Sequence, residues 1–374
     1  MIYLLMFGIT AGLGALVQRE KCAGIRAARI FLSMMIILIP SILGGLRSST
    51  LGTDNITYAK QFETAVTTSA RTILFSGNTE IMNRVLRLVV SRLTKDYHWY
   101  FFAVEVITMA FAYGGMYYFR EKVPLWQSLL VYLFCFYCLR IHLIWQGAAL
   151  AVVFFAFRYI ELRRPVKYFL LVGLAMLFHM SAIIGALIWV FYRILEMPDG
   201  GERPVKLHPG VLVVSIFALI ILLPVLTKAL VQIGILPKSY ATYANGPLLK
   251  LDREETVTRL PLLIIATVLY RDMSGKEPMW RFLYVMLWTE FLIAQYGSSF
   301  SHAWRISLYF GYFNMITIPC LIRVVRNERG ERTAASFLMI AYLAAFWVYW
   351  FVLNNRGFTY PVYPYISDVF PALV

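Results

Sequence analysis

Charged and titratable side chains stand within or beside the apolar segments of this chain, and they are its first candidates for chemistry. An ionised side chain near the centre of a bilayer costs about 2.5 to 3.5 kcal/mol or more, so each one needs a reason to be there. The set expected on one side of the apolar segments is Arg47, Asp54, Glu80, Glu105, Arg140, His142, His179, Glu290, His302 and Arg305. Arginines suit phosphate groups, whereas carboxylates and histidines suit proton transfer.

Arg47 and Asp54 flank a glycine-containing turn that runs from Gly45-Leu46-Arg47 to Gly52-Thr53-Asp54. An arginine there can form two parallel hydrogen bonds to a phosphate or diphosphate, and a nearby carboxylate can orient it or act as a base. An ion pair that closes the loop explains the same residues equally well. Both interpretations stay open on the sequence.

Three glutamates allow structural as well as catalytic roles. Glu80 is a candidate general base, but Arg84 follows it by four residues, the spacing of a helical salt bridge. Glu105 and Glu290 lie inside apolar segments. For these two, pairing with arginines of neighbouring helices is the simpler expectation.

A histidine and a second arginine complete the candidates. His179 stands in Leu177-Phe178-His179-Met180-Ser181, where a break in a helix lets it relay a proton or bind a phosphate oxygen. A hydrogen-bonded packing histidine is the alternative. Arg305 lies in the short loop 297–305, expected on the same side as Arg47. Two arginines from distant parts of the chain are what a lipid diphosphate requires, and exposed loop arginines are the alternative.

Aromatic residues gather near the carboxyl end. Trp347, Tyr349 and Trp350 precede Tyr360, Tyr363 and Tyr365. Aromatic rings stack on sugars, but they also form the interfacial belt of any membrane protein. The pair Cys135 and Cys138 lies inside an apolar run, where packing is a simpler role than redox or metal chemistry.

Transmembrane helices must position these residues. The chain has 374 residues, 60% of them hydrophobic, and a mean hydropathy of +0.67, and its apolar stretches recur at the length that crosses a bilayer. We expect spans near 2–17, 30–46, 99–119, 123–139, 141–160, 168–192, 211–235, 256–270, 280–296, 306–322 and 334–352. The predicted fold class is all-α: one polytopic integral membrane domain over 1–374, with about 10–12 transmembrane helices and an outer-face vestibule segment at 47–98.

Basic loops predict the orientation. The net charge is +15, and Lys and Arg gather around residues 19–29, 158–167 and 323–332, which favours a cytoplasmic side for these loops. Five apolar runs lie between the last two loops, where the number of crossings must be even. Either the stretch around Leu260 fails to cross, or 168–192 breaks near His179 into two half-helices that enter and return. We expect the break, which makes His179 line a cavity. The segments 238–245 and 354–374 then face outside.

The stretch 78–95 differs from the spans. Its apolar residues follow a helical period, and its polar residues share the opposite face of the same helix. This pattern predicts an amphipathic helix at the membrane interface. The apolar set is Ile81, Met82, Val85, Leu86, Val89 and Leu93, and the polar set is Glu80, Arg84, Arg87, Ser91 and Lys95.

Several common catalytic motifs are absent from the sequence. It contains no P-loop, no His-Glu-x-x-His and no Gly-x-Ser-x-Gly. Nucleotide-driven transport and hydrolase chemistry lose support, and we expect no cofactor and no metal.

Taken in order, these pieces resemble the EpsG-like family of Wzy-type bacterial exopolysaccharide and O-antigen repeat-unit polymerases. The matching positions are Gly45-Leu46-Arg47, Gly52-Thr53-Asp54, Tyr58, Glu80 with Asn83, Gln146-Gly147-Ala148-Ala149, Phe178-His179-Met180-Ser181-Ala182, Arg305, Tyr309-Phe310 and Tyr363-Pro364-Tyr365. One position departs from the pattern, because Trp145 stands where the family has an arginine before the glutamine. Arg140 is a substitute, although it lies five residues earlier and too far round a continuous helix for an equivalent reach.

The resemblance implies a multispanning glycosyltransferase, glycosyltransferase-C-like in architecture, in the bacterial cytoplasmic membrane with its site on the outer face. It implies transfer of a growing glycan from undecaprenyl diphosphate to a sugar hydroxyl of a new lipid-linked unit, beside a chain-length regulator and without nucleic acid. A ligase that uses the same lipid donor, or a transporter, remains an alternative, although the two halves of the chain show no inverted repeats.

The expected roles follow from this chemistry. Glu80, His179 and Asp54 are the candidates for catalysis, with Glu80 slightly ahead as the base. The remaining residues bind substrate: the diphosphate by Arg47, Arg305 and Arg140, and the sugars by Tyr363, Tyr365 and Gln146.

Overall fold

The computed structural model is helical throughout the residues it describes. These residues are 1–19, 25–75, 79–195, 208–234, 252–276, 279–298, 303–324, 329–354 and 362–370. His302, Tyr360 and the segment 238–245 lie outside them. Among the described helices, five have the length and composition to cross a membrane: 26–45, 97–121, 125–142, 144–161 and 330–353. The protein is a polytopic all-α membrane protein, as predicted.

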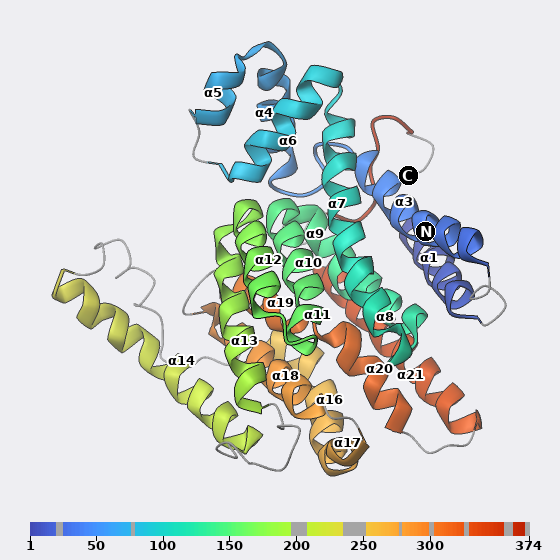
Figure 1. Ribbon diagram of the computed structural model, residues 1–374, viewed down its shortest axis with the longest axis vertical. Coiled ribbons are helices and arrows are strands. Elements are labelled where there is room, and N and C mark those ends of the chain that lie inside the picture. The colour runs from blue at the N-terminus through green and yellow to red at the C-terminus, as the bar shows by residue number, and fades with distance from the viewer. Residues whose placement is uncertain are drawn as a thin grey trace. The chain divides into compact units, whose positions relative to one another are not determined.

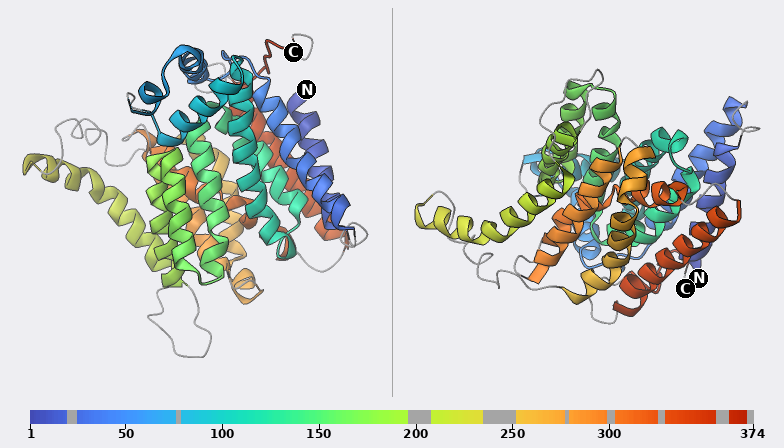
Figure 2. Two further views of the ribbon diagram at one scale, coloured as in Figure 1. Left: turned by 45° about the horizontal axis from the view of Figure 1, so that its top comes forward. Right: turned by 90° about the horizontal axis from the view of Figure 1, so that it is seen from below.

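The chain divides into two compact units, of which the first comprises 1–183 and 326–374. Its long helices follow the expected spans because each apolar run is long enough for a continuous hydrogen-bonded helix. They are α1 (Ile2–Gln18), α3 (Arg26–Gly45), α7 (Tyr97–Tyr118), α8 (Leu125–Tyr132), α10 (Ile144–Ala156), α12 (Pro165–Phe178) and α21 (Arg329–Trp347). α7 packs between α3 and α10, and α12 packs on the other side of α10 (Figure 2).

Two of the expected spans in this unit are interrupted. A π-helical turn, η2 (Leu133–Tyr137), and the short α9 (Cys138–His142) continue α8, and Leu143, with φ −107° and ψ 60°, then separates α9 from α10. α12 ends at Phe178, His179 is extended with φ −161° and ψ 126°, and a 3₁₀ turn, η3 (Met180–Ile183), follows. The predicted break at His179 is therefore present. Its re-entrant path stays a prediction.

Three short helices connect α3 to α7 and gather at one end of α7 (Figure 1). They are α4 (Asn55–Thr67), α5 (Ala70–Phe75) and α6 (Ile81–Leu93). α6 is the predicted amphipathic helix, and it buries Asn83, Arg87 and Ser91 against the protein. Its apolar positions Ile81, Val85, Val89 and Leu93 are 38–81% exposed. An apolar stripe that faces away from the protein suits contact with lipid.

The second unit covers 184–325. α18 (Trp280–Ala294) is its centre and contacts most of the other helices of the unit. The helices around it are α13 (Ile184–Leu195), α14 (Pro209–Gln232), α16 (Arg253–Val268), α17 (Tyr270–Lys276), α19 (Ala303–Gly311) and α20 (Asn314–Val324).

Candidate active site

Two glycines at the end of α3 let it approach α7 closely, and this contact places Arg47 beside Glu105. A Cβ atom on Gly44 would lie 2.7 Å from the Cγ of Glu105, and one on Gly45 would lie 2.7 Å from the Cβ of Phe102. Any larger residue would push the two helices apart. Arg47 follows the end of α3 by two residues, so its side chain reaches the same turn of α7.

Arg47 and Arg140 share the carboxylate of Glu105. The Nη1 of Arg47 lies 2.9 Å from Oε1, and the Nη1 of Arg140 pairs with Oε2. All three side chains are buried, with at most 3% of any one exposed. Two cations and one anion give these three side chains a net charge of +1. Because an uncompensated charge is costly inside a protein, the triad favours an additional anion.

The guanidinium of Arg47 has further donors available. Its Nη1 also donates to the carbonyl of Gly44, and its Cζ lies 4.3 Å from the ring centre of Phe101. Its Nε and Nη2 have no hydrogen-bond partner among the described residues. Burial lowers the pKa of Arg47 to about 10, which keeps it protonated at neutral pH. Buried N–H groups without partners are uncommon, and water or a ligand normally satisfies them.

Arg140 reaches this site because the helix breaks shortly after it. Leu143 interrupts the helix, and Gly147 then allows α10 to pack on the Arg140 side chain, since a Cβ at 147 would lie 2.7 Å from the Cβ of Arg140. The helix between Arg140 and position 145 is therefore not continuous, and the use of Arg140 in place of the missing arginine stays a prediction. Trp145, the residue in the arginine's place, is buried with its ring centre 6.1 Å from that of Tyr100.

The loop after Arg47 packs against the end of α9. Gly52 has φ +94°, a conformation that favours glycine, and the side chain of Asn55 donates to the carbonyl of Ile141 at 3.1 Å. Thr53 and Asp54 lie between these anchors. The Thr53 hydroxyl lies 2.7 Å from Nδ1 of His142 and 3.5 Å from Oδ1 of Asp54. No sequence spacing signals the pairing of Thr53 with His142, because 89 residues separate them.

The segment 362–368 holds this loop from the other side. The N–H of Ser48 donates to the carbonyl of Ile366 at 2.8 Å, and the Ser367 hydroxyl donates to the carbonyl of Leu46 at 2.6 Å. Tyr365 is buried and donates to the carbonyl of Leu43 at 2.8 Å. This bond ties Tyr365 to the end of α3, and its expected contact with a sugar stays a prediction. Tyr363 is partly exposed, with its ring 5.7 Å from that of Trp347.

Glu80 lies at the start of α6, next to a second group of polar residues. It occupies the N-cap without a side-chain capping bond, while Arg84 donates to the carbonyl of Leu74 at 2.7 Å. One turn further on, Asn83 accepts a hydrogen bond of 2.7 Å from the buried hydroxyl of Tyr100. The arginine four residues after Glu80 therefore has a backbone partner. Glu80 itself is partly exposed.

His179 is engaged in the turn that interrupts its helix. Its Nδ1 lies 2.6 Å from the Ser181 hydroxyl and accepts from the N–H of Ser181 at 3.3 Å. Its neighbour Phe178 stacks on Trp145, with ring centres 6.2 Å apart. This contact places the break beside the start of α10, where Gln146 is also buried.

The second unit contains Arg305 and Glu290. Arg305 is partly exposed in the first turn of α19, with its Cζ 5.4 Å from the ring centre of Trp304. Glu290 accepts from Nε of Arg259 at 3.1 Å and from Nδ2 of Asn314 at 2.7 Å. Glu290 therefore has the structural pairing expected for it, as Glu105 has. The joint action of Arg305 and Arg47 stays a prediction.

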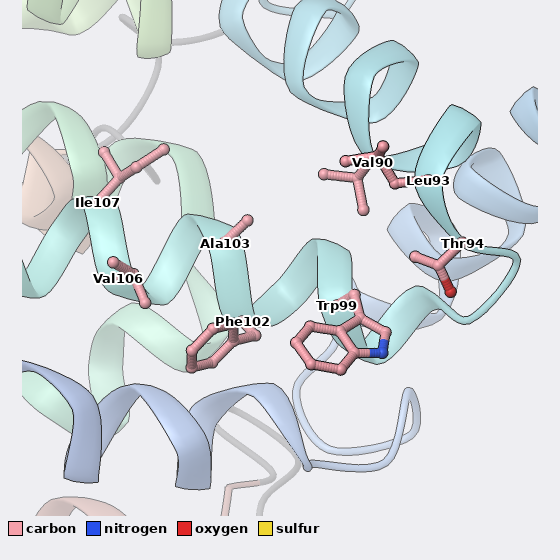
Figure 3. Close-up of a pocket in the computed structure, with 8 residues that line it drawn as sticks. All are labelled: Val90, Leu93, Thr94, Trp99, Phe102, Ala103, Val106 and Ile107. Atoms are coloured by element: carbon pink, nitrogen blue, oxygen red, sulfur yellow. The ribbon is translucent and has the colours of Figure 1, made fainter.

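An apolar groove separates α6 from the first turns of α7 (Figure 3). It has a volume of about 710 Å³ and only one polar residue, Thr94, in its lining. Phe102 is shared between the groove and the contact with Gly45, and Phe101, beside it in the chain, covers Arg47. The lining residues are Val90, Leu93, Thr94, Trp99, Phe102, Ala103, Val106 and Ile107.

Metal and thiol chemistry find no site in the described part of the chain. No group of three or more His, Cys, Asp or Glu side chains there is placed to hold a metal ion. Cys138 is buried and accepts a hydrogen bond from Nε1 of Trp347 at 3.3 Å. Cys138 thus contributes to packing between α9 and α21.

The chain was compared with protein families, with curated proteins and with solved structures. The model of the EpsG family matches residues 30–367, which is nearly the whole chain and includes the Arg47, Glu105 and Arg140 triad. No curated protein and no solved structure matches. The family match supports a polymerase-like role in polysaccharide biosynthesis at a membrane. On the extent of this match, the chain belongs to the EpsG family.

Proposed function

We propose that the protein is a glycosyltransferase that polymerises oligosaccharide repeat units linked to undecaprenyl diphosphate on the outer face of the cytoplasmic membrane. The growing glycan leaves its lipid diphosphate and joins a sugar hydroxyl of a new lipid-linked unit. Family membership supports the polymerase role, and the basic loops support the orientation.

The buried arginine triad is the observation that carries the proposal. A diphosphate leaving group develops negative charge as its bond to the sugar breaks, and preorganised cations in a low-dielectric site stabilise that charge. Arg47 has two buried N–H groups without partners, and the triad has an excess positive charge. Arg140 acts from α9, and Arg305 is the second arginine that we assign to the diphosphate.

The remaining parts of the substrate have their own sites in this proposal. The groove between α6 and α7 receives the first isoprene units of the donor, since it is apolar and lies one residue along α7 from the ring that covers Arg47. Tyr363, Tyr365 and Gln146 remain the sequence-based candidates for contact with the sugars. Asp54, Glu80 and His179 remain the sequence-based candidates for the group that takes the acceptor proton.

The test uses purified protein in lipid nanodiscs with one lipid-linked repeat unit as both donor and acceptor. We expect products of two or more units on one lipid, resolved by gel or mass spectrometry. Arg47→Gln should abolish them, and Arg120→Gln, whose guanidinium stacks on Tyr117 at 3.9 Å near the opposite end of α7, should not. No elongation by the wild type would reject the polymerase, and transfer only to an unrelated acceptor would identify a ligase.

A further inference from the structure

We propose that Thr53 and His142 form the proton relay of the transfer reaction. The Thr53 hydroxyl takes the proton from the acceptor sugar and passes its own proton to His142. This inference rests on the proposed function and names a residue pair at the same site.

The geometry of the pair fixes the direction of proton transfer. The Thr53 backbone N–H donates to Nδ1 of His142 at 3.4 Å, and the Thr53 hydroxyl lies 2.7 Å from the same nitrogen. Nδ1 therefore carries the lone pair, and the proton of the neutral ring is on Nε2. In the relay, the Thr53 hydroxyl turns its proton to Nδ1 of His142, and Oδ1 of Asp54, 3.5 Å from the same hydroxyl, is the other acceptor within its reach.

Burial gives the two residues different tasks. Thr53 is exposed, whereas His142 is only 6% exposed. A substrate hydroxyl can therefore reach Thr53, and the imidazole behind it is shielded from bulk water. The alternative for such a pair is a loop anchor, but Gly52 and the bond from Asn55 to Ile141 already hold this loop against α9.

The pair comes from the same loop and the same short helix as two of the cations assigned to the leaving group. His142 follows Arg140 by two residues on α9, and Arg140 joins Glu105 and Arg47. One relay end and one diphosphate ligand thus come from the same short helix. A transfer reaction needs the relay and the diphosphate ligands in one site, because the acceptor oxygen and the leaving oxygen are bound to the same carbon in the transition state.

The loop and the helix of His142 both contribute charged groups near it. Asp54 lies on the loop side, 3.5 Å from the Thr53 hydroxyl, and Arg140 lies on α9 itself. The neighbouring η2 contributes Tyr137, and α10, which packs on α9, carries no titratable group between Ile144 and Ala156. Asp54 is therefore the anion that offsets the imidazolium formed during transfer. His179, by contrast, has its Nδ1 engaged by Ser181 within its own turn.

The step balances without a further reactant. The acceptor O–H bond breaks, and its oxygen pair forms the new bond to the anomeric carbon of the donor. The bond from that carbon to the diphosphate oxygen breaks, and the diphosphate leaves with that electron pair. Thr53 gains one proton and loses one, and His142 holds the released proton and later returns it to solvent through the exposed Thr53 hydroxyl.

The test measures the initial rate of dimer formation between pH 5 and pH 9, with wild type, Thr53→Val, Thr53→Ser and His142→Gln. A side-chain base contributes about 10² to 10⁴ in rate. We expect losses of that size for Thr53→Val and His142→Gln, and recovery to within about tenfold of wild type for Thr53→Ser. The wild-type rate should fall at low pH as the histidine becomes protonated, and His142→Gln should lack that fall.

His98→Gln is the matched control, since His98 also pairs with a side chain near the start of α7, its Nδ1 lying 2.6 Å from Asp96. It should keep the wild-type rate and profile. If the wild type elongates and either Thr53→Val or His142→Gln keeps its rate and pH dependence, the relay is wrong. If His142→Gln does not fold, Thr53→Val at the exposed position decides alone. If the wild type itself fails to elongate, the proposed function has failed, and the relay with it.

Discussion

Replacing Glu105 by glutamine tests whether the triad of Arg47, Glu105 and Arg140 is a preformed site for an anion. Two unit charges 2.9 Å apart interact by about 6 kcal/mol at an effective dielectric constant of 20, and part of this is lost to desolvation. Removal of one partner from a buried ion pair typically costs about 3 to 5 kcal/mol. Because Glu105 serves two arginines, Glu105→Gln raises the charge of the cluster from +1 to +2. We expect a loss in the upper part of that range.

The free energy of unfolding can be measured by titration with SDS in mixed micelles, with and without inorganic pyrophosphate. Pyrophosphate should stabilise Glu105→Gln more than the wild type, and a second change, Arg140→Met, should recover part of the loss by returning the cluster to +1. The matched control is Glu161→Gln, because Lys122 lies 2.6 Å from Glu161 but is 43% exposed. That variant should lose at most about 1 kcal/mol. Equal losses in the two variants, or no added response to pyrophosphate, would refute the reasoning.

Three further predictions concern the diphosphate, the groove and the segment 362–368. Arg47→Lys and Arg305→Lys should each shorten polymers and lower the elongation rate about tenfold or more, since lysine cannot form two parallel bonds to phosphate; wild-type polymer from both would exclude this role. Ala103→Trp fills the groove and should lower the elongation rate with a long-chain donor about 30-fold, the equivalent of about 2 kcal/mol or two to three buried CH₂ groups. The same variant should use a short-chain donor at the wild-type rate, and the exposed control Ala110→Trp should use both donors at that rate. Burial acts to raise the pKa of Asp368, but hydrogen bonds from Tyr97 and Ser48 and the charge of His98 bring that pKa below its usual value. The ionised carboxylate therefore stabilises the segment 362–368 at neutral pH, and this stabilisation is lost as the pH falls through the folded pKa. The protection of 362–368 from protease should then fall in acid for the wild type but not for Asp368→Asn, and the same pH profile in both would exclude Asp368 as the source.

The sequence predicts those features of the fold that depend on local pattern. The spans follow from the length of the apolar runs, the break at His179 from the parity of crossings, and the helix at 81–93 from its periodicity. Periodicity does not reveal which face meets the protein, so the inward polar face of α6 appears only in the structure.

The candidate site was less accessible to sequence reasoning, because its contacts are long-range. Arg140 joins Arg47 through a carboxylate on a third helix, and the interruption at Leu143 has no glycine or proline to signal it. Tyr365 matches the family pattern, and its hydroxyl donates a hydrogen bond to a residue 322 positions away, which no spacing in the sequence indicates. Conversely, the glycines at 44, 45 and 147 are visible in the sequence, and each marks a close approach that the site needs.

The bonds between 362–368 and the loop after α3 also set an order of assembly. Leu43, Leu46 and Ser48 receive their partners from residues made more than 300 positions later. While the chain is still being synthesised, α3 can enter the membrane, but the loop that carries Arg47 lacks these bonds until the segment has been translated and delivered to the same side. The candidate site is therefore completed only after the last part of the chain has been made, however early α3 is inserted.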